Sequence, residues 1–246
     1  MLKRIGFILM LASGMTIGAS ECTFDDIDKD GWWFWTNWEI PKHCQLLNLS
    51  KNRLGAEGAQ LLATALKEND TLLWLNLYTS YIGDEGAKAL ATALKENKNI
   101  KLTSLILNEN DIGYEGAREL AAALLINETL TELDLGRNEI GGEGAKELAT
   151  ALKENKKIKL TELNLFRNGI GYEGAKALAA AMLVNDTLTS LNLQNNGIGF
   201  EGAKALATVM KGNDTLTELY LQSNNKKEAV LNEVMDALWL NQQSHE

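Results

Sequence analysis

The feature that most constrains this chain is a six-residue phrase that recurs six times. Each copy has Leu or Ile, then Gly, a variable residue and Glu-Gly-Ala, and successive copies begin 28, 30, 28, 30 and 28 residues apart. Self-similarity at a fixed period of about 20–50 residues is typical of stacked repeat architectures. The chain is therefore expected to be one array of similar units. The copies begin at Leu54, Ile82, Ile112, Ile140, Ile170 and Ile198.

Two hydrophobic periods alternate within each repeat. In the segment 160–165, Leu163 and Leu165 share one face of a short strand, and the residue between them is polar. In the segment 87–97, Ala and Leu side chains at 87, 90, 91 and 94 lie on one face of a helix. Asn97 is expected to end that helix in the left-handed conformation, which Asn tolerates. One strand and one helix cannot bury their apolar faces alone, so neighbouring units must stack.

A recurring Asn stands at the turn after each strand, as the last residue of an LxLxxN pattern. Its amide group can bond to backbone groups at the turn and form a ladder from one repeat to the next. Ser80 replaces this Asn in the second repeat, so we expect a weaker ladder there. The ladder residues of the following repeats are Asn110, Asn138, Asn168 and Asn196.

These motifs resemble the leucine-rich repeats of the ribonuclease-inhibitor type, and the consensus LxxLxLxxNxIGxEGAxxLAxALxxN is similar to that of the NOD-like receptors. The resemblance covers roughly residues 44–225. It implies a curved α/β solenoid with parallel strands on the concave face and helices on the convex face. It also implies a binding scaffold rather than an enzyme. Seven strands are expected to begin near Cys44, Leu72, Leu102, Leu130, Leu160, Leu188 and Leu216, with a helix after each of the first six.

The first 20 residues have the order of a secretory signal peptide. Cations at positions 3 and 4 precede an apolar run from Ile5 to Ala19, and small residues lead to the acidic Glu21. The run is shorter than the roughly 20 residues that a spanning helix needs, and Cys22 is misplaced for a lipoprotein signal. We therefore expect a secreted or extracytoplasmic protein without membrane contact beyond the leader. The alternative is a buried N-terminal helix.

The ends of the array differ from the repeats and predict four segments. Residues 1–20 are the signal peptide, and residues 21–43, with four of the six Trp, are an N-terminal cap. Residues 44–225 hold about seven leucine-rich repeats. Residues 226–246 are a C-terminal capping helix and tail, because apolar side chains recur there at helical spacing. Terminal repeats need such caps to cover their open core edges.

Export would place Cys22 and Cys44 in an oxidising compartment, where a disulfide is expected. The bridge would close a loop of about 20 residues and contribute roughly 3 kcal/mol in the chain-entropy model. Two buried free thiols are the alternative.

Composition argues against several function classes. Lys+Arg 24 against Asp+Glu 33 gives 24 − 33 = −9, and an acidic chain repels nucleic acid. The two histidines, His43 and His245, lie far apart in sequence. His43 adjoins Cys44, but adjacent strand residues point to opposite faces. No P-loop, GxSxG or HExxH motif occurs. We therefore expect a monomer that is not an enzyme, with no catalytic residue, cofactor or metal site.

The concave face is the predicted partner-binding surface. Phe166 stands between Arg137 and Arg167 in the expected array, and an aromatic ring beside two planar cations can supply apolar area and bind carboxylates. The side chains could instead pack on one another across strands, and nearby acids could neutralise the Arg pair. The predicted partner-binding residues are of the types that anchor interfaces: Trp74, Tyr78, Asp134, Arg137, Phe166, Arg167 and Tyr220.

Three other patterns each have a functional and a simpler interpretation. The segment Asp26–Gly31 resembles the start of a calcium loop, but Asn37 stands where a bidentate acid is expected, which favours an acidic turn. The lysines of two longer linkers could meet an acidic partner or form solvated loops: Lys98, Lys101, Lys156, Lys157 and Lys159. Glycosylation sequons occur at positions that the repeat pattern also explains, apart from the first: Asn48, Asn69, Asn127, Asn185 and Asn213.

The sequence therefore predicts an exported, non-enzymatic scaffold that docks a protein partner on its concave face. The alternative is a regulator of an enzyme, because repeats of the ribonuclease-inhibitor type also build GTPase-activating proteins of the Ran system and nuclease inhibitors. Those proteins act in the cytosol, and the leader argues against that site of action. A third possibility is a purely structural surface array.

Overall fold

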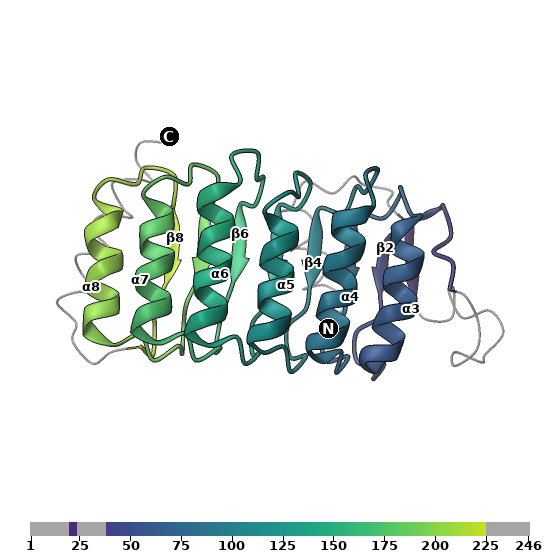
Figure 1. Cartoon of the computed structure of the whole chain (residues 1–246), viewed down its shortest axis with the longest axis horizontal. Coiled ribbons are helices and arrows are strands. Elements are labelled where there is room, and N and C mark those ends of the chain that lie inside the picture. Colours follow the sequence, from purple (N-terminus) through teal and green to yellow (C-terminus); the bar gives the residue numbers. More distant parts are fainter. Residues whose placement is uncertain (1–19, 24–37, 225–246) are drawn as a thin grey trace.

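The computed structural model describes residues 20–23 and 38–224, which form one array of stacked strand–helix units (Figure 1). Eight parallel strands form one sheet in the order β1 to β8, and six helices form a second layer. The strands are β1 Ser20–Thr23, β2 Cys44–Asn48, β3 Trp74–Asn76, β4 Ser104–Ile106, β5 Glu132–Asp134, β6 Glu162–Asn164, β7 Ser190–Asn192 and β8 Glu218–Tyr220. The helices are α3 Gly55–Lys67, α4 Gly83–Glu96, α5 Tyr114–Leu124, α6 Gly141–Glu154, α7 Gly171–Met182 and α8 Gly199–Met210.

The predicted fold class, an α/β leucine-rich repeat solenoid, is confirmed in its layers and its strand direction. Strands β2 to β8 are the seven that the repeat pattern predicts, and a helix follows each of the first six. Parallel strands lie about 4.8 Å apart, whereas packed helices need about 8–10 Å. An array with one strand and one helix per unit must therefore bend with its sheet on the inside.

The two glycines of the recurring phrase have different physical roles. Gly141 begins α6 with φ +66, a left-handed backbone conformation that side chains with a Cβ rarely adopt. Gly144 is needed for close packing, because a Cβ there would lie 2.5 Å from Ile140 Cγ2 and 3.1 Å from Ala117 Cβ of the preceding helix. The phrase thus sets the approach between neighbouring helices and, except at Gly113 before α5, where φ is −95, the left-handed turn into the helix.

The core lies between the sheet and the helices as one continuous cluster. Leu163 and Leu165 on and beside β6 are buried, as are Leu148 and Leu152 of α6. Trp38, the Trp of the predicted cap that the structure describes, is 4% exposed and joins the same cluster. Each unit therefore buries its apolar face only by contact with its neighbours, as the period predicts.

The Asn ladder joins successive repeats. Asn138 Nδ2 donates to Leu107 O (3.0 Å), and Asn138 Oδ1 accepts from the backbone N–H groups of Asn110 and Ile112 (3.0 Å each). Ser80 Oγ makes the corresponding donation to Leu49 O (3.1 Å), but among the described residues no backbone N–H group of the preceding turn donates to this hydroxyl. The prediction of a weaker rung at Ser80 is confirmed.

The expectation for Asn97 is wrong in its conformation. Asn97 follows α4 with φ −76 and ψ 102, which is extended rather than left-handed. Its side chain explains this geometry, because Nδ2 donates to Leu66 O (2.7 Å) and Asn69 O (2.6 Å) of the preceding repeat. Asn97 therefore acts as a hydrogen-bond donor to the preceding repeat and not as a left-handed helix cap.

The N-terminal edge of the sheet carries a strand that the repeat pattern does not predict. Strand β1 pairs in parallel with β2 and so extends the sheet at the predicted cap. Residues 1–19 of the predicted leader, 24–37 of the predicted cap, which include the acidic turn Asp26–Gly31, and the capping helix and tail at 226–246 lie outside the described residues. Among the helices that are described, none is both long and apolar enough to span a membrane.

Candidate protein-binding surface

The sheet register aligns the outward side chains of β2 to β8 in two rows. The first row runs across one position of each strand, and the second row runs two residues further along. We call them the first row and the second row of the sheet face. The first row is Leu46, Trp74, Ser104, Glu132, Glu162, Ser190 and Glu218; the second row is Asn48, Asn76, Ile106, Asp134, Asn164, Asn192 and Tyr220.

The first row changes from apolar to acidic along the array. It begins with buried Leu46 and half-buried Trp74, and its second half holds Glu132, Glu162 and Glu218. Burial, followed by the charges of Glu132 and Glu218, raises the pKa of Glu162. Like charges in one row disfavour ionisation unless a cation approaches. This half of the face therefore suits a cationic group.

The second row is committed largely to turn geometry, which the sequence reasoning missed. Asn76 Oδ1 accepts from Tyr78 N–H (2.9 Å), and Asn164 Oδ1 accepts from Phe166 N–H (3.0 Å). Such a bond two residues ahead is an Asx turn, which Asn and Asp favour. The recurrence of Asn at this position was the available signal. Most side chains of this row thus set the strand-to-loop turn and are not free to select a partner.

Asp134 is the acidic member of the second row and has an unusual titration. Its Oδ1 accepts from Gly136 N–H (2.8 Å), as the Asn residues do in other repeats. Burial raises the pKa of Asp134 to about 6, and the hydrogen bonds from Gly136 and Asn164 oppose this rise. Asp134 therefore changes charge near neutral pH, which makes the middle of the face sensitive to pH.

The structure brings together only part of the predicted aromatic–arginine cluster. Arg137 lies with its Cζ 5.4 Å from the centre of the Phe166 ring, and its Nη1 lies 3.1 Å from Glu109 Oε1. Arg167 is exposed and has no ion pair among the described residues. An acid thus neutralises one member of the Arg pair, as the alternative allowed, and Arg167 remains available.

Three predicted aromatic residues lie on or beside the face at different exposures. Tyr78 is half-buried, with Lys51 Nζ 5.5 Å from the centre of its ring. Tyr220 is 38% exposed, and its hydroxyl donates to Glu218 Oε2 (3.0 Å). Burial and this bond raise the pKa of Tyr220. With Trp74 near the other end of the first row, aromatic side chains flank both ends of the sheet face.

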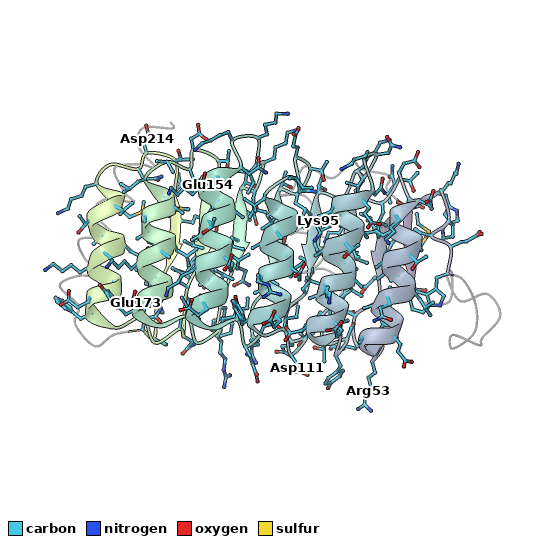
Figure 2. All side chains as sticks on the ribbon, in the orientation of Figure 1. Arg53, Lys95, Asp111, Glu154, Glu173 and Asp214 are labelled. Carbon is cyan, nitrogen blue, oxygen red and sulfur yellow. A yellow bond between two sulfur atoms is a disulfide. The ribbon has the colours of Figure 1, made fainter. Side chains whose placement is uncertain are left out.

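The edge where the helices end carries the sequons and the Lys linkers. Asn69 is 8% exposed, and its Oδ1 accepts from Leu72 N–H (2.8 Å); the equivalent asparagines at 127, 185 and 213 are buried in the same way. These sequons therefore have structural roles. Figure 2 labels Glu154 and Asp214 at this edge, and Arg53 and Asp111 at the opposite one.

The Lys linkers are exposed loops of mixed character. The five predicted lysines are all exposed, and Lys157 Nζ pairs with Glu128 Oε1 at 3.0 Å.

Apolar residues lie at the same edge in alternate repeats, and the sequence did not single them out. They follow directly on the apolar residues of a helix, so in the sequence they look like part of its buried face. These residues are 40–60% exposed: Leu125, Ile126, Leu183 and Val184.

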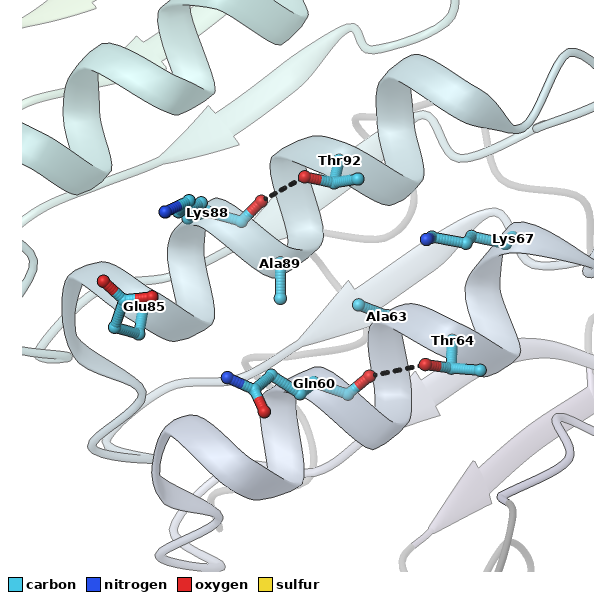
Figure 3. A pocket seen from close by; sticks show the side chains of 8 residues that line it. All are labelled: Gln60, Ala63, Thr64, Lys67, Glu85, Lys88, Ala89 and Thr92. Carbon is cyan, nitrogen blue, oxygen red and sulfur yellow. Dashed lines mark hydrogen bonds between the residues drawn. The ribbon is translucent and has the colours of Figure 1, made fainter.

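A groove between α3 and α4 lies on the helix layer (Figure 3). Thr64 Oγ1 donates to Gln60 O (3.0 Å) and Thr92 Oγ1 donates to Lys88 O (2.9 Å), so both hydroxyl groups bond within their own helices. Neither threonine hydroxyl is therefore hydrogen-bonded to a side-chain base that would activate it as a nucleophile.

Cys22 and Cys44 form a disulfide that joins β1 to β2, with Cα atoms 5.7 Å apart. His43 lies beside this bridge, and its Nε2 is 3.7 Å from Cys22 Sγ. The expectation that His43 and Cys44 point to opposite faces is wrong. His43 precedes the strand in a turn that Cys44 N–H closes on Pro41 O (2.8 Å), so the side chains do not alternate there.

The sequence profile of the leucine-rich repeat family matches residues 45–63, 98–121, 127–149, 156–179 and 184–207. The array is a leucine-rich repeat solenoid. The structure of leiomodin-1 actin-binding site 2 is similar to this solenoid, with TM-score 0.57 and 27% identity, over 63% of this chain and 88% of that one. The C-terminal domain of Caenorhabditis elegans tropomodulin shares the fold, with TM-score 0.56 and 17% identity, over 64% and 94%. No curated protein sequence matches the solenoid; the ribonuclease-inhibitor type remains a prediction.

Proposed function

We propose that the chain is an exported, non-enzymatic scaffold that binds a protein partner on its sheet face. The observation that carries this proposal is the contrast between the two rows. Asx turns occupy most of the second row. The first row presents Trp74 and three glutamates, of which Glu132 and Glu218 accept hydrogen bonds from neighbouring side chains on the same face and none has an ion pair among the described residues. Trp is a residue type that anchors interfaces, and a row of acids supplies charge complementarity to a basic partner.

The acidic half of the first row favours a partner that presents Lys or Arg side chains. A cation placed between Glu132 and Glu162 would offset the burial and the like-charge repulsion that together raise the pKa of Glu162. Trp74 would take an apolar side chain of the same partner. Exposed Arg167, at the loop beside Phe166, would hold a carboxylate at the rim. The partner is thus expected to carry basic residues toward the centre of the contact and an acid at its edge.

Actin is a defined partner to test, because leiomodin-1 actin-binding site 2 is similar to this chain at 27% identity. A shared fold alone does not carry function, so the basis for this test is that likeness together with the acidic first row. The second candidate, regulation of an enzyme in the cytosol, rests on the resemblance of the repeats to the ribonuclease-inhibitor type.

The binding experiment compares two variants with the same change in charge. Glu132→Gln, Glu162→Gln and Glu218→Gln together neutralise the first row. Capture of purified actin, and of proteins from the native environment, should fall at least tenfold for this variant. The control is Glu57→Gln, Glu173→Gln and Glu201→Gln, which removes three exposed charges from the helix layer. Equal capture by both triple variants would contradict binding through the sheet face.

The site of action is tested separately from the binding surface. N-terminal sequencing of the mature protein should show cleavage near Ser20, where the predicted leader ends. An intact N-terminus together with cytosolic recovery would reject export and favour the enzyme-regulator alternative.

A further inference from the structure

Three metal-ligating side chains converge at the N-terminal edge of the sheet. Cys22 lies on β1, Cys44 is the first residue of β2, and His43 lies in the turn before it. The two Sγ atoms and a ring nitrogen of His43 all lie within 4.8 Å of one another. The pairing of β1 with β2 and the turn closed on Pro41 produce this convergence from distant parts of the sequence.

The spacing of these atoms fits a tetrahedral zinc site. Bonds of about 2.3 Å to sulfur and about 2.0–2.1 Å to nitrogen place the ligand atoms of such a site about 3.5–3.8 Å apart. His43 Nε2 lies 3.7 Å from Cys22 Sγ in the oxidised state. The His43 ring thus already points its nitrogen at the sulfur, and the residue itself is exposed.

We propose that Cys22, His43 and Cys44 form a Zn²⁺ site when their disulfide is reduced. A disulfide supplies no thiolate, so the oxidised form cannot ligate the ion. A dithiol reductant gives two electrons and two protons to the S–S bond, which breaks into two thiols while the dithiol becomes a disulfide. Zn²⁺ then replaces the two thiol protons, which pass to solvent, and takes the neutral Nε2 of His43 as its third ligand.

The fourth position of the site faces solvent. Both cysteines are buried, at 1% and 0% exposure, whereas His43 is exposed, so the open position lies on the side of the imidazole. A water molecule completes the tetrahedron there, as in zinc sites with three protein ligands. Two thiolates balance the charge of the ion.

The disulfide and the metal exclude each other but hold the same two strands together. Oxidation joins β1 to β2 covalently, and the ion would join them through its ligands after reduction. The N-terminal edge of the array would therefore stay closed in both an oxidising and a reducing compartment. This inference does not rest on the proposed partner or on export.

The test uses the full chain, reduced with a phosphine that does not chelate metals and then titrated with Co²⁺ as a spectroscopic probe. The reduced protein should bind one equivalent and show a thiolate-to-cobalt charge-transfer band, which Zn²⁺ removes by displacement. The oxidised protein should show no band. Absence of the band in the reduced protein would overturn the proposal.

His43→Ala is the deciding variant, because it keeps both cysteines and the disulfide. Loss of an outer-shell partner costs metal sites about 10- to 100-fold in affinity, so loss of this direct ligand should weaken Zn²⁺ binding at least tenfold in competition with a chromophoric chelator. His245→Ala, at the other histidine, is the matched control. Equal affinity of His43→Ala and the wild type would reject the three-ligand site. Cys22→Ser with Cys44→Ser should abolish the band while the helical circular dichroism of the repeats persists.

Discussion

The interrupted Asn ladder predicts that Ser80→Asn stabilises the protein. Ser80 is fully buried, and its side chain makes one cross-repeat bond, to Leu49 O. At Asn138, the same position supplies that kind of bond and also accepts from two backbone N–H groups of the preceding turn. In the first repeat the matching N–H groups belong to Asn52 and Leu54, and no ladder side chain reaches them among the described residues.

The magnitude follows from the two bonds that the substitution adds. A neutral hydrogen bond contributes about 0.5–1.5 kcal/mol net, so two of them give about 1–3 kcal/mol before losses. Burying the longer Asn side chain costs about 1 kcal/mol of rotamer freedom. The expected net gain in the free energy of unfolding is about 1 kcal/mol. Asn110 and Asn138 are buried at equivalent positions, so the slot accommodates an amide.

The assay is urea unfolding of the oxidised protein, followed by far-ultraviolet circular dichroism. Ser80→Asn should raise the midpoint without changing the slope, because the folded surface stays the same. Asn138→Ser is the reverse control and should lower stability by about 2 kcal/mol or more, because it leaves two buried N–H groups without an acceptor. If Ser80→Asn lowers the midpoint while Asn138→Ser has no effect, the ladder does not couple the repeats as the hydrogen bonds indicate.

Three further changes test other parts of the structure. The pKa of Asp134 in the folded protein, about 6, exceeds the value of 3.8 expected for a free Asp. Protonated Asp134 therefore stabilises the fold below pH 4, and the free energy of unfolding should fall by about 3 kcal/mol as pH rises through 6. Asp134→Asn should flatten this dependence in denaturation measured from pH 4 to 8. Gly144→Ala should lower the thermal midpoint, because the added Cβ meets Ile140 Cγ2 at 2.5 Å; an unchanged midpoint would show that the helices shift freely. Phe166→Ala with Arg167→Ala should weaken partner capture by about 2 kcal/mol and leave unfolding nearly unchanged; full capture by this variant would exclude the rim of the sheet face from binding.

The site could be predicted from the sequence only in part. Alternation with the core Leu places Trp74 and Tyr220 outward, because successive strand residues face opposite sides. The same rule gave no information on which outward groups are free. Asp134 was predicted as a binding residue, yet it bonds to Gly136 N–H, and Arg137 is paired with Glu109. Such bonds depend on backbone groups and side chains of a turn or a neighbouring repeat, which the local pattern does not place.

The sequence by itself determined the array, since a period of 28–30 residues with one strand and one helix leaves each unit an apolar face that only a like unit can cover. It also determined the weak rung, because the single hydroxyl oxygen of Ser does not replace the separate amide nitrogen and oxygen of Asn. The tertiary structure alone decided that His43 joins the predicted Cys22–Cys44 pair at the N-terminal edge. The pairing of β1 with β2 and the turn at Pro41 bring Cys22 to His43, 21 residues apart in the chain. Repeat periodicity fixes contacts between equivalent residues of neighbouring units, but it carries no information about segments that are not repeats.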